Sequence, residues 1–436
     1  MRRREVGHVG ELSHGGDEVF HGWKLVAALA VILFFTAGGG LYVFPVYIGP
    51  LQAEFGWSIT QISAGAALFA IVMGFSNPLV GVLFARLGAR ATMLLAAFVT
   101  VLTSVAYASL QSLPMLYAIF LVSGFAVAAT TILPAQALVI SWFDRYRGRA
   151  MGLTMLGIGA GGFALPPLNE LLIRLVGWRL AWLVSAAVLV VVVIPLIAVF
   201  VRTRPSDLGL RPDGERSEPG GSGASSKVLR GLPVGLALRS GTFWQLAAIY
   251  VLQLIGVSAL NFHFVPFATQ EAGFTAQQAA AFYGLAVGAS IAGRLLFGWL
   301  ADRWPPGGLL AITLILLALG PGALELLIVE LGRREVDLLW LYAVPFGLGI
   351  GGNAVIMPVL VGRCFGELHF SRIMGLLMGG FAAGVVVGIP GAGWIFDETG
   401  SYEWVLILCA TGLGLAAMLA ALLRPDRHHT EFATAE

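Results

Sequence analysis

The 436-residue chain is 58% hydrophobic and only 11% charged, whereas charged residues make up roughly 25% of a typical soluble domain. A soluble fold of this length would leave large apolar patches in water, so the composition predicts a membrane protein. The net charge of +2 gives no reason to expect a nucleic-acid partner. Cys364 and Cys409 form neither a disulfide framework nor a metal-ligand pattern, and we expect no cofactor and no metal.

The chain begins with a polar tail at residues 1–22 that includes Arg2, Arg3 and Arg4. The apolar segment that follows is too long for a signal-peptide core, so we predict that it is retained as the first membrane span. A helix needs about 20 mostly apolar residues to cross a bilayer. By this criterion the first half, residues 23–200, contains six spans: 23–49, 59–84, 91–110, 113–140, 149–171 and 179–200.

A long polar stretch at residues 201–240 separates this half from the next. It contains the run Pro219-Gly220-Gly221-Ser222-Gly223, which is typical of a flexible linker. The second half, residues 241–424, contains spans at 243–268, 275–300, 308–329, 337–362, 373–396 and 403–423, and a polar tail follows at 425–436. We therefore predict an all-α membrane protein with about twelve transmembrane helices in two six-helix bundles.

The distribution of Lys and Arg predicts the orientation, because these residues favour cytoplasmic loops. With a cytoplasmic N-terminus, most of the 26 Lys and Arg residues fall in cytoplasmic segments, and the outer loops hold only Arg174, Arg179, Arg333 and Arg334. We predict that both terminal tails and the 201–240 linker are cytoplasmic.

The two halves also repeat in sequence. A shift of 217 residues aligns identical residues early in each half, and a shift of 223 aligns others later. Parallel repeats of six spans are common in secondary transporters, which hold the substrate near the middle of the membrane between the repeats. The matched pairs include Glu54 with Glu271, Gly56 with Gly273, Gly81 with Gly298, Arg149 with Arg372, Pro167 with Pro390 and Gly177 with Gly400.

Two loops resemble the Gly-x-x-x-Asp-Arg-x-Gly signature of the major facilitator superfamily, namely Gly81–Gly88, with Ala85 in the Asp position, and Gly298–Arg303. Segment 142–153 resembles the fifth-span signature of monocarboxylate carriers, an aromatic pair and basic residues followed by Ala-x-Gly-Leu. His21-Gly22-Trp23 is similar to the opening of their first span, and segment 204–210 to the start of their central loop in bacteria. The resemblance covers roughly residues 20–425.

This resemblance implies the major facilitator fold with its twelve helices in two bundles related by a parallel repeat. It implies a monomeric, multi-pass transporter in the bacterial inner membrane, with both termini cytoplasmic. It also implies a secondary active or facilitative carrier of a small organic anion, a monocarboxylate in particular, that works by alternating access. Its partners would be that anion, the lipid bilayer and, in a symporter, a co-transported proton.

Arg294 is the residue that we expect to bind the substrate. It lies eight residues before Asp302, so about 12 Å of helix separates it from the cytoplasmic end of its span. A charge at this depth costs at least about 2.5–3.5 kcal/mol and needs a partner. The helix offers only Ser290 and Gly298 one turn away, and a guanidinium matches a carboxylate geometrically. The resemblance agrees, because family members place an anion-binding Arg here. The alternative is a structural Arg that binds a backbone carbonyl or reaches the cytoplasmic surface.

Two departures from the family concern the same site. Ser290 stands where proton-coupled carriers have Asp, and Phe381 stands about where oxalate-type exchangers have Lys. A lone cation favours a monoanion over a dianion, and the missing Asp leaves the coupling ion open.

His263, three residues before Pro266, either takes a proton near neutral pH or is a neutral structural residue. Asn353, on a glycine-rich stretch, either lines the pore or bridges helices.

The loop charges have two readings. As solvated charges they would only set the topology, whereas the resemblance makes them gate residues whose contacts lock one conformation. We hypothesise that Ala85 weakens the gate of the first half. The gate candidates are Gly81, Arg86, Arg90, Arg145, Arg147, Asp302 and Arg303.

Three other functions compete with an anion carrier. An efflux carrier of a larger amphipathic compound would suit the many Phe and Trp residues. A polytopic membrane enzyme would need clustered His, Asp or Glu, or a nucleophile with its base, at membrane depth, and the sequence has neither, so we expect no enzyme. A receptor or structural protein would show no counterflow of substrate in membrane vesicles. The sequence also lacks a nucleotide-binding loop, which argues against ATP-driven pumping.

Overall fold

A computed structural model describes residues 20–214, 231–326, 332 and 336–423. Within these ranges, ten helical segments are long and apolar enough to cross a membrane. One of them, Gln61–Ala108, has 48 residues and contains two of the expected spans, 59–84 and 91–110. A further 30-residue helix, Phe370–Thr399, contains the expected span 373–396. Each of the twelve expected spans is therefore helical over most of its described residues, and the chain has the two-bundle fold that the sequence predicts.

The first half consists of the helices before the linker. They are α1 (His21–Tyr42), η1 (Phe44–Tyr47), α2 (Ile48–Phe55), α3 (Ile59–Ala108), α4 (Leu113–Thr130), α5 (Ile132–Trp142), α6 (Arg147–Val176), α7 (Trp178–Val188), η2 (Leu189–Val193) and α8 (Ile194–Phe200). The second half consists of α10 (Gly241–Pro266), η5 (Phe267–Glu271), α11 (Ala276–Ala301), α12 (Pro306–Leu324), η7 (Val336–Leu339), α13 (Trp340–Phe365), α14 (Phe370–Thr399) and α15 (Glu403–Ala421).

Helix boundaries differ from the expected spans where the backbone leaves helical geometry. Within α3 the chain turns at Gly88, whose φ of 80° is a conformation that suits glycine, so the two expected spans remain distinct. The expected span 113–140 breaks at Thr131 between α4 and α5. The expected span 179–200 contains a π-helical turn, η2, between α7 and α8. A hydropathy count does not see such breaks, because it depends on composition alone.

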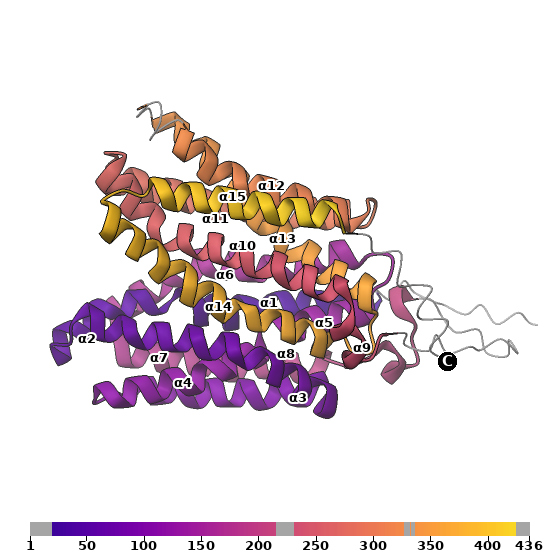
Figure 1. The fold of residues 1–436 in the computed structure, drawn as a ribbon. Helices are drawn as coiled ribbons and strands as arrows, with labels where there is room; N and C mark the ends of the chain where they lie inside the picture. Colours follow the sequence, from indigo (N-terminus) through magenta and orange to yellow (C-terminus); the bar gives the residue numbers. More distant parts are fainter. Residues whose placement is uncertain (1–19, 215–230, 327–331, 333–335, 424–436) are drawn as a thin grey trace, which may run out of the picture.

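The two halves lie side by side and diverge toward one end, as Figure 1 shows. Their helices come together at the opposite end, where the short linker helix α9 (Val234–Arg239) lies. Close backbone contacts between the halves occur near this closed end. A Cβ on Gly81 of α3 would lie 2.4 Å from the carbonyl oxygen of Ser371, and a Cβ on Gly148 of α6 would lie 2.3 Å from that of Gly298. Glycine at these positions lets the halves meet.

The sequence repeat has a structural counterpart at the open end. Glu54 accepts hydrogen bonds from the Trp178 indole (2.8 Å) and from Arg179 (2.6 Å) at the start of α7. Its repeat partner Glu271 accepts bonds from the Ser401 hydroxyl and the Tyr402 backbone N–H, both 2.7 Å. Each half thus uses the equivalent carboxylate to bind the start of its last span or the loop just before it.

The described part of the linker is attached to both halves. Asp213 accepts hydrogen bonds from the backbone N–H groups of Asp144 (3.0 Å) and Arg145 (2.7 Å) in the loop between α5 and α6. Beyond the undescribed residues 215–230, the Leu232 N–H donates to the carbonyl of Phe365 at the end of α13 (2.9 Å). The 201–240 stretch therefore contains anchored segments that its composition did not predict.

Candidate functional site

Helix α11 lies between α6 of the first half and α13 of the second, and glycines allow the close approach on both sides. A Cβ on Gly152 of α6 would lie 2.5 Å from the carbonyl oxygen of Arg294. A Cβ on Gly351 of α13 would lie 2.0 Å from that of Ser290. A real Cβ does not fit at such distances, so larger residues would push α11 away from its neighbours. The glycine-rich stretches of α6 and α13 thus position the segment that carries Arg294.

Arg294 is almost completely buried, with 6% of the residue's surface exposed. Its Nη1 donates a hydrogen bond to the Ser290 hydroxyl at 2.8 Å, and that hydroxyl donates to the Val287 carbonyl at 2.6 Å. The buried Nε has no acceptor, and Arg294 forms no ion pair within the described ranges. A guanidinium has five N–H donors and keeps its proton, so this one is a buried cation with most of its bonding capacity unused.

The guanidinium faces the first half of the protein. A Cβ on Gly159 of α6 would lie 2.9 Å from Nη1, and one on Gly162, about a turn further along, would lie 3.0 Å from the Tyr42 ring of α1. Arg294 and Tyr42 thus pack against the same stretch of α6. A site built from α1, α6 and α11 joins both halves, which is where a carrier with two repeats is expected to bind its substrate.

The other predicted substrate residues also belong to the second half. Asn353 of α13 is 2% exposed, and its Nδ2 has no hydrogen-bond acceptor among the described residues. His263 of α10 uses both ring nitrogens within its own half, with the Tyr402 hydroxyl at 3.2 Å and the Ile389 carbonyl at 3.0 Å. Phe381 lies on α14, and its side chain is outside the described part of the structure. Among the predicted residues whose side chains are described, Ser290 is the one that forms a hydrogen bond with Arg294.

Asp302, at the end of α11, binds the first turn of α6 in the opposite half. It accepts hydrogen bonds from the backbone N–H groups of Gly148 (2.7 Å) and Arg149 (3.3 Å), and it pairs with the Arg149 side chain at 3.4 Å. Burial raises the pKa of the Asp302 carboxyl above its ordinary value, and the two backbone bonds oppose that rise. An acid at a helix N-terminus compensates the unpaired N–H groups there, so this contact holds the halves together.

Arg147 makes a second contact between the halves. Its guanidinium pairs with Glu367, in the loop between α13 and α14, and its Nε donates to the Phe143 carbonyl at 2.6 Å. Glu367 was not among the predicted residues. The sequence repeat could have identified it, because the shift of 223 residues places Asp144, three residues before Arg147, on Glu367.

The remaining gate candidates differ in their contacts. Gly81 accepts a 3.3 Å hydrogen bond at its carbonyl from Ser371 of α14, across the halves. Arg145 and Arg303 lie over neighbouring aromatic rings, those of Tyr146 and Trp299, within their own halves. Arg86 and Arg90 are exposed at the closed end. Of the predicted set, Gly81, Arg147 and Asp302 therefore have described contacts that join the halves.

The family model of the major facilitator superfamily matches residues 29–330, which include all of the first half except the start of α1, and helices α10, α11 and α12 of the second. The chain belongs to this superfamily. Its curated relatives include monocarboxylate transporter 12 of Rattus norvegicus, 24% identical over 431 residues, with 92% of this chain and 84% of the relative covered. Monocarboxylate transporter 13 of Bos taurus is 28% identical over 391 residues, with 87% and 84% covered.

Solved structures show the same superfamily fold over nearly the whole chain. The transporter FucP in its outward conformation aligns with a TM-score of 0.68 and 15% identity, covering 92% of this chain and 99% of FucP. The human organic anion transporter MFSD10 aligns with a TM-score of 0.67 and 17% identity, covering 92% of this chain and 99% of MFSD10. These comparisons establish a multi-pass membrane transporter of the superfamily, with monocarboxylate transporters among its curated relatives.

Proposed function

We propose that this transporter carries a small monocarboxylate and binds its carboxylate at Arg294 between the two halves. The observation that carries the proposal is the buried guanidinium with an unpaired Nε and no ion pair among the described residues. A buried charge without a partner is strongly unfavourable. A substrate carboxylate supplies the negative charge and two acceptor oxygens in the planar arrangement that a guanidinium prefers. The monocarboxylate transporters among the relatives support the same substrate class.

Alternating access is the second part of the proposal. The described contacts of Gly81, Arg147 and Asp302 join the halves at the end that carries the linker. The positive-inside bias makes that end cytoplasmic, so the described conformation would be open toward the outside. Release of the substrate then requires these contacts to break while the halves close at the other end. We further propose a monomer in the bacterial inner membrane, with cytoplasmic tails at 1–22 and 425–436 and a linker at 201–240 between the two bundles.

Uptake of labelled carboxylates into proteoliposomes tests the Arg294 site. We expect uptake of monocarboxylates by the unchanged protein, a loss of at least about tenfold in Arg294→Ala, and partial activity in Arg294→Lys, since a charged hydrogen bond contributes about 1.5–3 kcal/mol. Arg174→Ala is the matched control, because Arg174 pairs with Glu170 on the exposed surface of α6. All variants must elute as single species of the same size.

Equal uptake of the best substrate by all variants would contradict the anion site and favour the larger amphipathic cargo. An imposed pH gradient distinguishes proton symport from facilitated transport. Uptake that the gradient stimulates supports proton symport, whereas uptake that follows the substrate gradient alone supports facilitated transport.

A further inference from the structure

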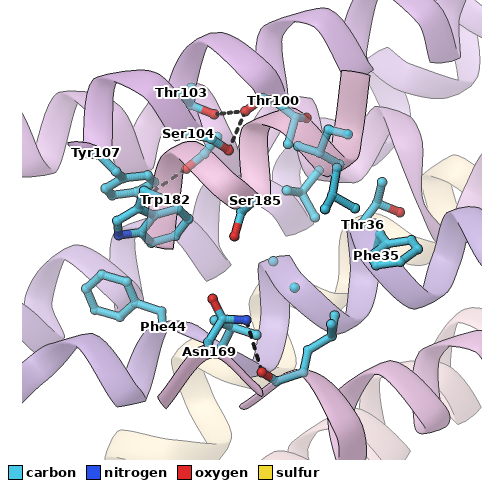
Figure 2. Close-up of a pocket in the computed structure, with 18 of the residues that line it drawn as sticks. Phe35, Thr36, Phe44, Thr100, Thr103, Ser104, Tyr107, Asn169, Trp182 and Ser185 are labelled. Carbon is cyan, nitrogen blue, oxygen red and sulfur yellow. Dashed lines mark hydrogen bonds between the residues drawn. The ribbon is translucent and has the colours of Figure 1, made fainter. Parts of the chain in front are cut away.

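A cavity of about 340 Å³ lies inside the first half and is separate from the Arg294 site. Helices α1, α3, α4, α6 and α7 contribute to its wall, and every lining residue lies between Phe35 and Leu189 (Figure 2). Its volume is within the range of about 300–1,000 Å³ that is usual for pockets that bind small molecules. The proposed transport site does not account for this cavity.

The polar groups of this cavity are mostly hydrogen-bond acceptors. None of the lining residues is Asp, Glu, Lys, Arg or His. Five hydroxyls in the wall already donate their protons to backbone carbonyls of their own helices, at 2.7–3.0 Å, and so can only accept a further bond. They belong to Thr36, Thr100, Thr103, Ser104 and Ser185.

Aromatic rings and an amide complete the polar end of the cavity. The indole of Trp182 stacks between the rings of Tyr47 and Tyr107, at centroid distances of 4.6 and 4.4 Å. The Asn169 amide oxygen accepts a bond from the Tyr47 hydroxyl at 2.8 Å. In Figure 2 the Ser185 hydroxyl and the Asn169 amide point into the same open space beside the Trp182 ring. A ligand here would meet a flat aromatic surface and a group of oxygen acceptors.

The second half contains the equivalent cavity without the polar groups. A space of about 220 Å³ lies between α10, α14 and α15, which correspond to α1, α6 and α7 in the repeat. The same shifts of 217 and 223 residues relate the lining residues of the two cavities. Gly256 corresponds to Gly39, Ala392 to Asn169, Val405 to Trp182 and Leu408 to Ser185. The fold therefore forms this crevice with apolar residues alone, and the hydroxyls of the first cavity are not a requirement of packing.

The first cavity has an apolar entrance on the side of the bundle. Leu168 and Leu171 of α6 and Val184 of α7 line it and are 50%, 53% and 40% exposed. Exposed leucine and valine on membrane-spanning helices suit contact with lipid. Leu189, at the beginning of the π-helical turn η2, lies in the wall, and such turns often occur at functional sites.

We propose that this cavity binds a small uncharged amphiphile, an alcohol or phenol, that enters from the bilayer. The apolar part of the ligand fills the space between α1, α6 and α7, and its O–H donates to the hydroxyl oxygens around Ser185. Because the wall carries no charge, an anion such as the transported carboxylate does not compete for it. The same helix α1 packs against α6 near Arg294, so an occupant affects transport without occupying the substrate site.

Binding of 4-propylphenol to the purified full-length protein tests this proposal by a thermal shift. The methyl ether, 4-propylanisole, has the same shape and no O–H. We expect a saturable rise in melting temperature with the phenol and a much smaller one with the ether. Ser185→Ala removes one acceptor without closing the cavity. It should raise the phenol concentration at half-saturation about fivefold, which is the effect of one hydrogen bond. Ser185→Leu introduces the residue of the equivalent position in the second half and should abolish the shift.

Leu408→Ala is the matched control, because it changes the equivalent position of the apolar cavity and should leave the phenol response unchanged. Quenching by 4-bromophenol gives a second readout, with a saturable component that disappears in Trp182→Phe. Equal shifts with the phenol and the ether would overturn the proposal, since they would indicate partition without a hydrogen bond. An unchanged response in both Ser185 variants would overturn it as well, because the ligand would then bind elsewhere.

Discussion

The ion pair between Arg147 and Glu367 provides a direct test of how the closed end is held together. Only 9% of the Arg147 side chain and 15% of the Glu367 side chain is exposed. Removal of one partner from a buried pair costs about 3–5 kcal/mol. In Glu367→Gln, Arg147 keeps the Phe143 carbonyl at 2.6 Å and the more distant Asp144 carboxylate at 3.7 Å. We therefore expect a smaller loss of about 2 kcal/mol, which is roughly a 30-fold increase in the ratio of open to closed molecules at this end.

Spin labels on the two halves can measure this ratio. Leu87 and Trp304 are exposed in the equivalent loops of the first and second half, and cysteines there can be labelled after Cys364 and Cys409 are replaced by alanine. We expect Glu367→Gln to add a population with a longer distance between the labels in double electron–electron resonance.

Glu170→Gln is the matched control, because its pair with Arg174 lies on the surface of a single helix and contributes about 0.3–0.5 kcal/mol. If Glu367→Gln changes the ratio no more than this control does, the Arg147 pair does not hold the closed end.

Three further predictions follow from other contacts. Gly152→Ala should open the closed end, because its Cβ would lie 2.5 Å from the Arg294 carbonyl oxygen, and faster labelling of the native Cys364 would show this. Ala85→Asp should place an acid near the start of α14. A helix cap contributes roughly 1 kcal/mol, so we expect labelling of Cys364 to slow about fivefold. An unchanged rate would contradict the hypothesis that Ala85 weakens the gate of the first half. Hydrogen bonds from Arg179 and Trp178 lower the pKa of Glu54 below 4.5. The stabilisation by this contact is therefore present above pH 4.5 and lost as the pH falls through the lowered value, so the melting temperatures of Glu54→Gln and the unchanged protein should differ at pH 7 and converge in acid.

Much of the fold was predictable because lipid imposes a simple requirement on sequence. A span needs a long apolar segment, and each of the twelve expected spans is helical over most of its described residues. The repeat register was also predictable, since Gly56 and Gly273 both adopt a positive φ, of 67° and 75°. Such identities persist in the two halves because the backbone geometry at these positions suits glycine.

The contacts between the halves were less predictable. Asp302 was recognised from its loop signature, but its acceptor role toward Gly148 depends on how the second half approaches the first. Glu367 was missed because it lies in a loop without a known signature, and only its partner Arg147 had been singled out. The hydroxyls around Ser185 were missed for another reason. Small polar residues are common in membrane helices, and only the folded bundle shows that several of them share one cavity.

The carboxylates of Glu54 and Glu271 have a consequence for the transport movement. Each joins the short helix after the first span to the start of the last span, or the loop just before it, and these described bonds all stay within one half. The hydrogen bonds of Glu54 and Glu271 can therefore persist throughout the transport cycle, while the contacts between the halves at the closed end break and reform. Each bundle can therefore tilt as a rigid body. The movement needed for transport then takes place at the surfaces where the two bundles slide past each other.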